Sequence, residues 1–313
     1  MGIPGNVLKS CIYVIDDMIA HFYYSVQTPA LLPEHLKNWR TEMSNVANKG
    51  TALVTGASSG IGAVYAQRLA ERGYDVILVA RNRDRLNELA STLTTSTGRN
   101  FEVVVADLGT PEGVRKVEDV LRNDSSITML VNNAGVGATA PLVDSDIDKM
   151  DAMITLNVVA LTHLTKAVVP GFVTRGGGTI VNISSIVAVS PETLNGVYGG
   201  SKAYVLALTQ SLHHELGAKG VRVQAVLPGA TSTEFWDIAG TPVSYLPESI
   251  VMTSQDMVDA ALAGLDQGEL VTIPSLPEAA DWNAFEAARQ TLIPNLSHRA
   301  PAARYGVTSG TQQ

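Results

Sequence analysis

Short apolar runs alternate with longer amphipathic stretches along most of the chain, from residue 51 onward. The runs are rich in Val, Ile and Leu with few polar residues, which is typical of parallel strands buried on both faces of a sheet. The stretches between them repeat apolar residues at three- and four-residue steps, as helices that cover a sheet do. The pattern predicts an α/β fold with a doubly wound parallel sheet. The expected strands are 51–55, 74–80, 101–107, 127–135, 179–184 and 221–229, and the expected helices are about 61–73, 83–93, 113–122, 146–173 and 197–217.

The two ends of the chain differ from this alternation. Residues 1–48 carry apolar side chains at helical spacing between Val7 and Val26, which predicts an N-terminal helical extension packed on its own domain or on a neighbouring subunit. The polar face of that helix lacks the basic stripe of a membrane-surface helix, although its apolar face leaves membrane contact open. We expect a single domain over residues 49–295 and a C-terminal tail of loop composition over 296–313.

Composition narrows the classes of function. The 313 residues are 45% hydrophobic and carry a net charge of −8. This balance argues against nucleic acid as a partner, because phosphate binding needs a surplus of Lys and Arg. The single cysteine, Cys11, cannot form an internal disulfide, and the histidines lack metal-binding spacing, so no metal site is expected. Neither a signal peptide nor an uninterrupted apolar run of about 18 to 20 residues is apparent, so a cytoplasmic location is expected.

A glycine-rich turn, TGASSGIG at 55–62, lies between the first expected strand and the first expected helix. In this setting Gly56 permits a tight turn, Gly60 lets the backbone approach a pyrophosphate, and Gly62 allows close helix packing. Free N–H groups at the start of the helix then attract an anion. The turn therefore predicts a dinucleotide site.

The end of the second expected strand indicates which dinucleotide binds. An acidic residue normally stands there to hold the ribose 2′-hydroxyl of NAD, but this chain reads Val79, Ala80, Arg81. A guanidinium can pair with a 2′-phosphate, so NADP(H) is favoured over NAD(H). Arg83 and Arg85 are expected to be solvated at the start of a helix. The alternative is an NAD-dependent enzyme in which Arg81 only covers the adenine.

The candidate catalytic groups lie within residues 184–202. Tyr198 and Lys202 are four residues apart on an expected helix and therefore share a face. An ammonium beside a phenol lowers its pKa from the usual value of about 10, which makes Tyr198 a general acid or base near neutral pH. Either Ser184 or Ser185, at the end of the preceding strand, could hydrogen-bond a substrate oxygen.

Together these motifs resemble those of the classical short-chain dehydrogenases/reductases, over residues 49 to about 275. TGASSGIG is similar to the family's TGxxxGxG turn, and NNAG at 132–135 to its strand-four motif. YGGSK matches YxxxK, and PGATST at 228–233 resembles the PGxxxT segment. The resemblance implies a Rossmann-like domain, nicotinamide chemistry and a homodimer or homotetramer formed through the long central helices.

The resemblance also implies roles for individual residues. The family's serine precedes its tyrosine by thirteen residues, which selects Ser185 and leaves Ser184 a structural role. Tyr198 would exchange a proton with the substrate oxygen, which Ser185 would position. Lys202 would lower the tyrosine pKa and hold the nicotinamide ribose, and Asn157 would support a water that links Lys202 to solvent. The implied cofactor-binding residues are Gly56, Ser58, Ser59, Gly60, Ile61, Gly62, Arg81, Asp107, Leu108, Asn132, Asn133, Ala134, Gly135, Tyr198, Lys202, Pro228, Gly229 and Thr233.

The substrate is expected to meet mostly apolar side chains. The region after Thr233 corresponds to the family's variable substrate lid, at about 230–255. Apolar walls suit a neutral ketone, aldehyde or alcohol, so we expect an NADP(H)-dependent carbonyl reductase or alcohol dehydrogenase. A nucleotide-binding sensor without turnover is the alternative outside the enzymes. The expected pocket residues are Val136, Val187, Leu194, Phe235 and Trp236.

Overall fold

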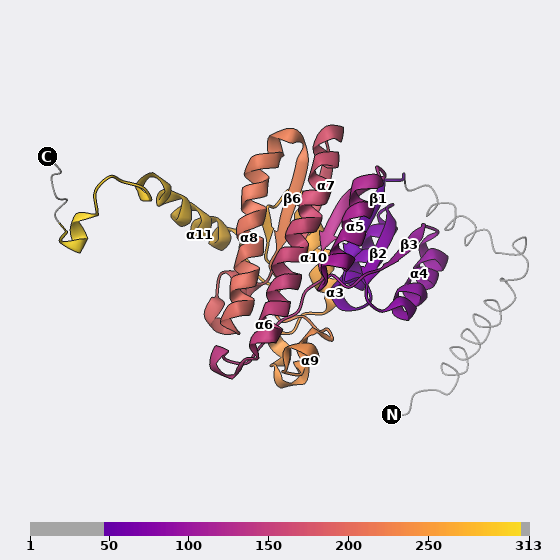
Figure 1. The fold of residues 1–313 in the computed structure, drawn as a ribbon, viewed down its shortest axis with the longest axis horizontal. Coiled ribbons are helices and arrows are strands. Elements are labelled where there is room, and N and C mark those ends of the chain that lie inside the picture. Colours follow the sequence, from indigo (N-terminus) through magenta and orange to yellow (C-terminus); the bar gives the residue numbers. More distant parts are fainter. Residues whose placement is uncertain (1–46, 308–313) are drawn as a thin grey trace, which may run out of the picture.

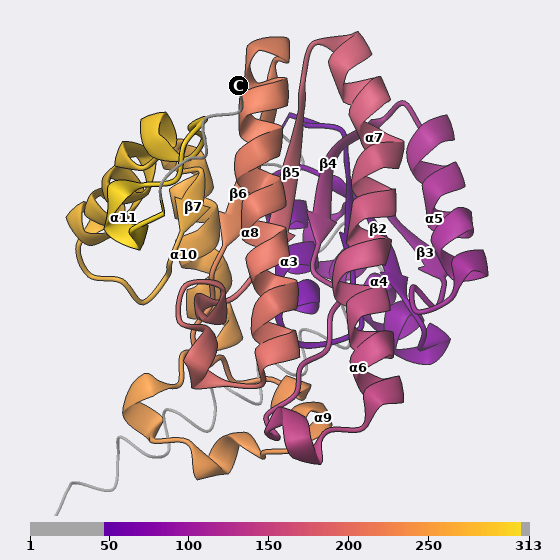
Figure 2. The same cartoon turned by 60° about the vertical axis from the view of Figure 1, so that its left-hand side comes forward.

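The computed structural model describes residues 47–307, which form a seven-stranded parallel sheet between two layers of helices (Figures 1 and 2). The order β3-β2-β1-β4-β5-β6-β7 reverses between β1 and β4, which confirms the expected doubly wound fold. The strands are β1 (Thr51–Thr55), β2 (Asp75–Ala80), β3 (Phe101–Val105), β4 (Ile127–Asn132), β5 (Gly178–Ile183), β6 (Val221–Val226) and β7 (Val271–Thr272).

The larger helices cover both faces of this sheet. Those in the described chain are α3 (Gly60–Glu71), α4 (Arg83–Thr97), α5 (Pro111–Asn123), α6 (Ile147–Ile154), α7 (Leu161–Arg175), α8 (Gly196–Leu216), α9 (Phe235–Ala239), α10 (Ser254–Gln267) and α11 (Ala279–Thr291). Helices α3, α4 and α10 pack on one face, and α5, α7 and α8 pack on the other.

Each central strand contributes side chains to both layers. In β1, Ala52 and Val54 belong to the core beneath α3 and α10, whereas Leu53 belongs to the core beneath α5 and α7. Side chains alternate between the two faces of a strand, and here both faces are buried. This double burial is the reason that β1, like β2, appears in the sequence as a run of mostly apolar residues.

The longest helical region lies over the middle of the sheet. Helix α6, a π-helical segment (Thr155–Ala160) and α7 follow one another without a break, as expected for 146–173. The region Ile147–Arg175 is long and apolar enough to cross a membrane, but 44% of its most apolar window is buried inside the protein. Its apolar side chains pack against α5, α8 and the sheet, so core packing accounts for its composition.

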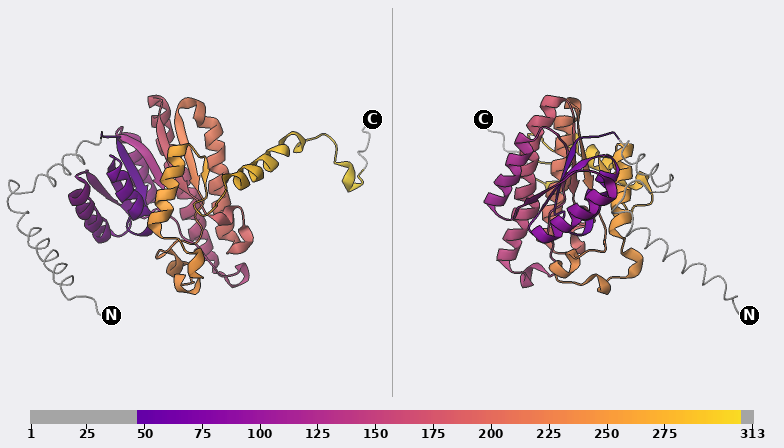
Figure 3. Two further views of the ribbon diagram at one scale, coloured as in Figure 1. Left: turned by 180° about the vertical axis from the view of Figure 1, so that it is seen from behind. Right: turned by 90° about the vertical axis from the view of Figure 1, so that its right-hand side faces the viewer.

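The C-terminal part of the described chain holds the elements that sequence reasoning missed. Strand β7 has two residues, too few for a periodic signal, and α10 and α11 follow the region expected to be variable. Helix α11 leads away from the body of the molecule (Figure 3). The expected N-terminal helix lies outside the described residues, and the expected tail is described only as far as Val307.

Candidate active site

A cavity of about 1110 Å³ lies at the carboxyl ends of the strands, beside the point where the strand order reverses. It exceeds the roughly 300 to 1,000 Å³ typical of a site for one small ligand. One end is lined by the glycine turn and by residues that follow β2 and β3. The other end is lined by the segment after β6, so the cavity can hold a dinucleotide beside a second molecule.

The glycine turn has the geometry of a phosphate site. Gly60 has a φ of +53°, a left-handed value that favours glycine. A Cβ on Gly62 would lie 2.3 Å from the carbonyl oxygen of Gly56, so only glycine lets α3 approach the turn this closely. Ser59, which precedes α3, makes no side-chain cap, and the first turn of α3 holds no acidic residue. The N–H groups and the positive end of this helix therefore remain available to an anion.

Most of the expected cofactor-binding residues lie on the cavity wall. They are Gly56, Ser58, Ser59, Gly60, Ile61, Arg81, Asp107, Leu108, Asn133, Ala134, Gly135, Tyr198, Lys202, Pro228, Gly229 and Thr233. Gly62 and Asn132 lie behind the wall. The amide of Asn132 donates to Asn182 Oδ1 (2.9 Å) and to Thr165 Oγ1 (3.1 Å), so its side chain joins β4 to β5 and α7 rather than facing the cavity.

Arg85 is exposed to solvent, as expected, and it also forms an ion pair across the crevice. Its Nη1 lies 2.7 Å from Oε2 of Glu234, which is 149 residues away in the segment after β6. Arg85, together with the hydroxyl of Ser59, holds the pKa of the Glu234 carboxyl below its usual value. This contact joins α4 and the glycine turn to the far side of the crevice. It could not be predicted from the sequence, because no local pattern relates the two residues.

The start of α8 brings three of the expected catalytic groups together. The side chain of Asn195 accepts hydrogen bonds from the N–H groups of Val197 and Tyr198, and this cap sets the position where the helix begins. This places the Tyr198 hydroxyl near Ser185, which follows β5, close enough for the serine to lower the pKa of the phenol. Lys202 lies one turn further along α8, and its Nζ donates to the carbonyl oxygen of Ile183 (3.0 Å).

The two serines have separate surroundings, as expected. The hydroxyl of Ser184 donates to the backbone oxygen of Lys202 (2.7 Å), so it ties β5 to α8. The hydroxyl of Ser185 accepts from the N–H of Val187 (3.3 Å) and donates to the oxygen of Pro228 (3.5 Å), and it lies close enough to Tyr198 to lower the pKa of that phenol. Only Ser185 therefore offers a hydroxyl at the reacting end of the tyrosine.

Asn157 lies behind the cavity wall, within the π-helical segment. Its side chain accepts from the N–H of Val136 (3.0 Å) and donates to the oxygen of the same residue (2.8 Å) and to Ser201 Oγ (3.1 Å). These bonds hold the loop after β4 against α8. Such π-helical insertions often occur at functional sites, where they redirect one side chain.

Burial governs the protonation of the catalytic pair. It raises the pKa of Tyr198 to about 12, and the hydrogen bond with Ser185 offsets part of that rise. Burial also lowers the pKa of Lys202 to about 8. The pKa of Tyr198 therefore lies above its usual value in this structure, whereas it was expected to lie below it. Lys202 Nζ lies 5.8 Å from the centre of the tyrosine ring, and loss of solvent around the phenol is the larger effect.

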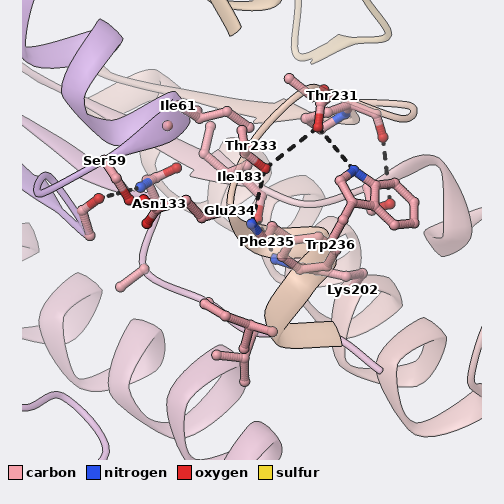
Figure 4. A pocket seen from close by; sticks show the side chains of 18 of the residues that line it. Ser59, Ile61, Asn133, Ile183, Lys202, Thr231, Thr233, Glu234, Phe235 and Trp236 are labelled. Atoms are coloured by element: carbon pink, nitrogen blue, oxygen red, sulfur yellow. Dashed lines mark hydrogen bonds between the residues drawn. The ribbon is translucent and has the colours of Figure 1, made fainter. Parts of the chain in front are cut away.

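The opposite end of the cavity is apolar, and all five expected pocket residues line it. The ring of Phe235 lies 5.8 Å from that of Tyr198, and Trp236 Nε1 donates to the oxygen of Thr231 (2.9 Å). Figure 4 shows Thr231, Thr233 and Trp236 across the cavity from Ser59 and Asn133. Four further wall residues in the lid were not identified from the sequence. They could have been suspected because they are apolar side chains in a loop that contains prolines: Leu246, Ile250, Val251 and Met252.

Lys202→Met tests the burial of the ammonium. Because folding lowers the pKa of Lys202 from 10.5 to about 8, the unfolded chain binds more protons between these pH values, and wild-type stability gains with rising pH there. We expect the free energy of unfolding of the variant, relative to wild type, to fall by about 2 to 3 kcal/mol from pH 7 to pH 10. Urea denaturation measures this difference. Lys166→Met, at an exposed site on α7, is the matched control. If the difference in free energy of unfolding between Lys202→Met and wild type did not vary with pH, the lowered pKa of Lys202 would be contradicted.

Comparison with known proteins places the chain in a family. The short chain dehydrogenase family model matches residues 50–241. A short-chain dehydrogenase from Sphingobium yanoikuyae in complex with NADPH is similar at 48% identity and a TM-score of 0.80, over 82% of this chain and 99% of that one. The bulky-bulky ketone specific alcohol dehydrogenase from Comamonas testosteroni is 45% identical with a TM-score of 0.76, over 83% and 99%.

A third relative has a different substrate in its name. The very-long-chain 3-oxoacyl-CoA reductase of Anas platyrhynchos is 36% identical over 209 residues, which are 64% of this chain and 67% of that protein. The order of the strands, the glycine turn and the neighbouring serine, tyrosine and lysine agree with the family match. The chain is therefore an oxidoreductase that belongs to the short-chain dehydrogenase/reductase family.

Proposed function

We propose that the protein transfers a hydride between NADP(H) and a neutral ketone or aldehyde, or the corresponding alcohol, with Tyr198 as the general acid or base. One observation carries the proposal: Tyr198 and Ser185 lie together between a phosphate-binding turn and an apolar pocket within a single cavity. The chemistry of proton transfer and the space for a dinucleotide thus meet at one place.

The side chains of the chain manage the proton. When bound, the nicotinamide group supplies or accepts the hydride. Tyr198 is protonated at neutral pH because burial raises its pKa, so its phenol can donate to the oxygen of a carbonyl substrate. Ser185 would hydrogen-bond the same oxygen and fix its place beside the phenol. Lys202, which is charged below about pH 8, would stabilise the phenolate that proton donation leaves and hold the ribose.

The adenosine end of the cavity supports NADP(H). Arg81 lines this end where an NAD-binding protein of this fold usually places a carboxylate. A guanidinium offers paired N–H groups to a phosphate. The NADPH complex of the Sphingobium relative is in line with this preference. NAD(H) is the rival cofactor, in which case Arg81 would only cover the adenine.

The substrate end supports a neutral and bulky compound. The cations on the described cavity wall are Arg81, Arg85 and Lys202, and each belongs to the cofactor end or to the catalytic group. An anionic substrate such as a coenzyme A thioester would thus find no charged partner beyond the catalytic tyrosine. The Comamonas relative, named for bulky-bulky ketones, favours ketones with two large apolar substituents as the first class to test.

Tyr198→Phe tests the proton transfer. Loss of the hydroxyl removes the general acid, so we expect kcat/KM for ketone reduction to fall by about 10² to 10⁴. NADPH oxidation, followed by absorbance with a panel of bulky aryl ketones, measures the effect. Tyr204→Phe is the matched control, because the Tyr204 hydroxyl contacts Thr162 on the outer side of the helices, away from the cavity. A variant at position 198 that keeps more than about a tenth of the activity would overturn the assigned role.

Arg81→Ala tests the cofactor preference. A charge-assisted hydrogen bond contributes about 1.5 to 3 kcal/mol, so kcat/KM for NADPH should fall roughly 10- to 100-fold while that for NADH changes little. Arg83→Ala removes the same charge from an exposed position that does not line the cavity, and it should leave both values unchanged. Equal losses with the two cofactors would favour the NAD-dependent alternative.

A further inference from the structure

Helix α11 and the residues that follow it form an arm that projects from the body of the molecule. We call residues 279–307 the C-terminal arm; two opposite views show it extending away from the sheet (Figures 1 and 3). No residue of α11 is buried. The arm nevertheless carries large apolar side chains that face solvent, namely Phe285, Leu292, Ile293, Leu296, Tyr305 and Val307.

Only the base of the arm is attached to the body. Trp282 packs on the apolar cluster formed by α8, β6 and β7, and Gln210 of α8 donates to Glu286 (3.2 Å). Beyond Glu286, every hydrogen bond in the described part of the arm stays within the arm. The base therefore sets the direction of the arm while its outer part has no support from its own domain.

Phe285 and Leu292 are exposed and stand seven residues apart, at α11 and its C-cap, so they share one side of the helix. We call this side, with Trp282 at its base, the apolar seam; Leu296 follows it beyond a 3₁₀ turn (Ile293–Asn295). The rings of Trp282 and Phe285 are 5.3 Å apart. A helix of 13 residues gains most of its stability from packing of its apolar face, so α11 needs a partner surface along this seam.

The charges of the arm are separated from end to end. Glu278 and Asp281 stand at its base, whereas Arg299 and Arg304 stand near its outer end. None of these four side chains takes part in an ion pair within residues 47–307. An arm that is acidic at one end and basic at the other is complementary to a copy of itself in the antiparallel direction.

We propose that the C-terminal arm packs antiparallel against the same arm of a second copy of this chain, about a two-fold axis. A two-fold interface uses the same surface of both subunits, so that surface must complement itself, as this one does. Antiparallel helices also place opposite ends of their dipoles together. In this direction the acidic base of each arm, with Glu278, faces the basic outer end of the other arm, with Arg299 of the partner subunit, twice per dimer.

The size of the arm suits this partner. A stable interface uses about 20 to 30 residues on each side, which the arm alone can supply. The surface is distinct from the outer faces of α7 and α8, where the family resemblance implies subunit contacts. A membrane surface is a poorer fit, because the base of the arm is acidic and membrane-binding helices usually carry a basic face.

Breaking the apolar seam is the first test. Full-length protein with Phe285→Glu and Leu292→Glu should show half the molar mass of wild type in sedimentation velocity at micromolar concentration. Asn283→Glu with Ala287→Glu adds the same charge on the opposite side of α11 and should keep the wild-type mass. Retained ketone reduction would show that the seam variant is folded. An unchanged mass of the seam variant, or a wild-type mass equal to one chain, would overturn the proposal.

Reversing the charges tests the antiparallel register. Glu278→Arg alone and Arg299→Glu alone should each weaken self-association about tenfold or more, because each places like charges together at two points. An equimolar mixture of the two variants should assemble as well as wild type, since every contact in the mixed dimer again joins opposite charges. A mixture that assembles no better than either variant would rule out this register and, with it, the antiparallel pairing.

Discussion

A parallel sheet must bury both of its faces, and the arrangement of this molecule follows from that constraint. Each strand returns to the sheet through a helix on one face, so all strands run in the same direction and their carboxyl ends meet at one edge. Leu53 faces one helical layer while its neighbours in β1 face the other. Loops rather than helices meet at that edge, and the reversal of strand order opens the crevice among them.

The features predicted from the sequence are those with a local or periodic signal. Strands β1, β2 and β4 are largely buried and leave apolar runs, and β3, β5 and β6 remain recognisable because most of their residues are apolar. Tyr198 and Lys202 are recognisable because one helical turn joins them, and the glycine turn because its residues are contiguous. The choice of Ser185 needed the spacing of a known family, since nothing in the local pattern separates it from Ser184.

The features that could not be predicted from the sequence depend on the burial of a side chain or on contacts between residues far apart in the chain. Spacing places Lys202 beside Tyr198 but does not show that both are buried, and burial reverses the expected direction of the tyrosine pKa. Arg85 and Glu234 are 149 residues apart, so no local pattern connects them. Strand β7 has only two residues, too few to show a periodic pattern. Helix α11 has no buried residue, so no apolar face packed on its own domain marked it in the sequence.

The bridge between Arg85 and Glu234 connects the two ends of the crevice. Glu234 reaches the adenosine end of the crevice, and the next residue, Phe235, packs on the ring of Tyr198 at the substrate end. Adjacent residues at the start of a short helix cannot move independently. A molecule that displaces Glu234 therefore also shifts the aromatic wall of the pocket. Contacts made at one end of the crevice are thereby linked to the shape of the other end.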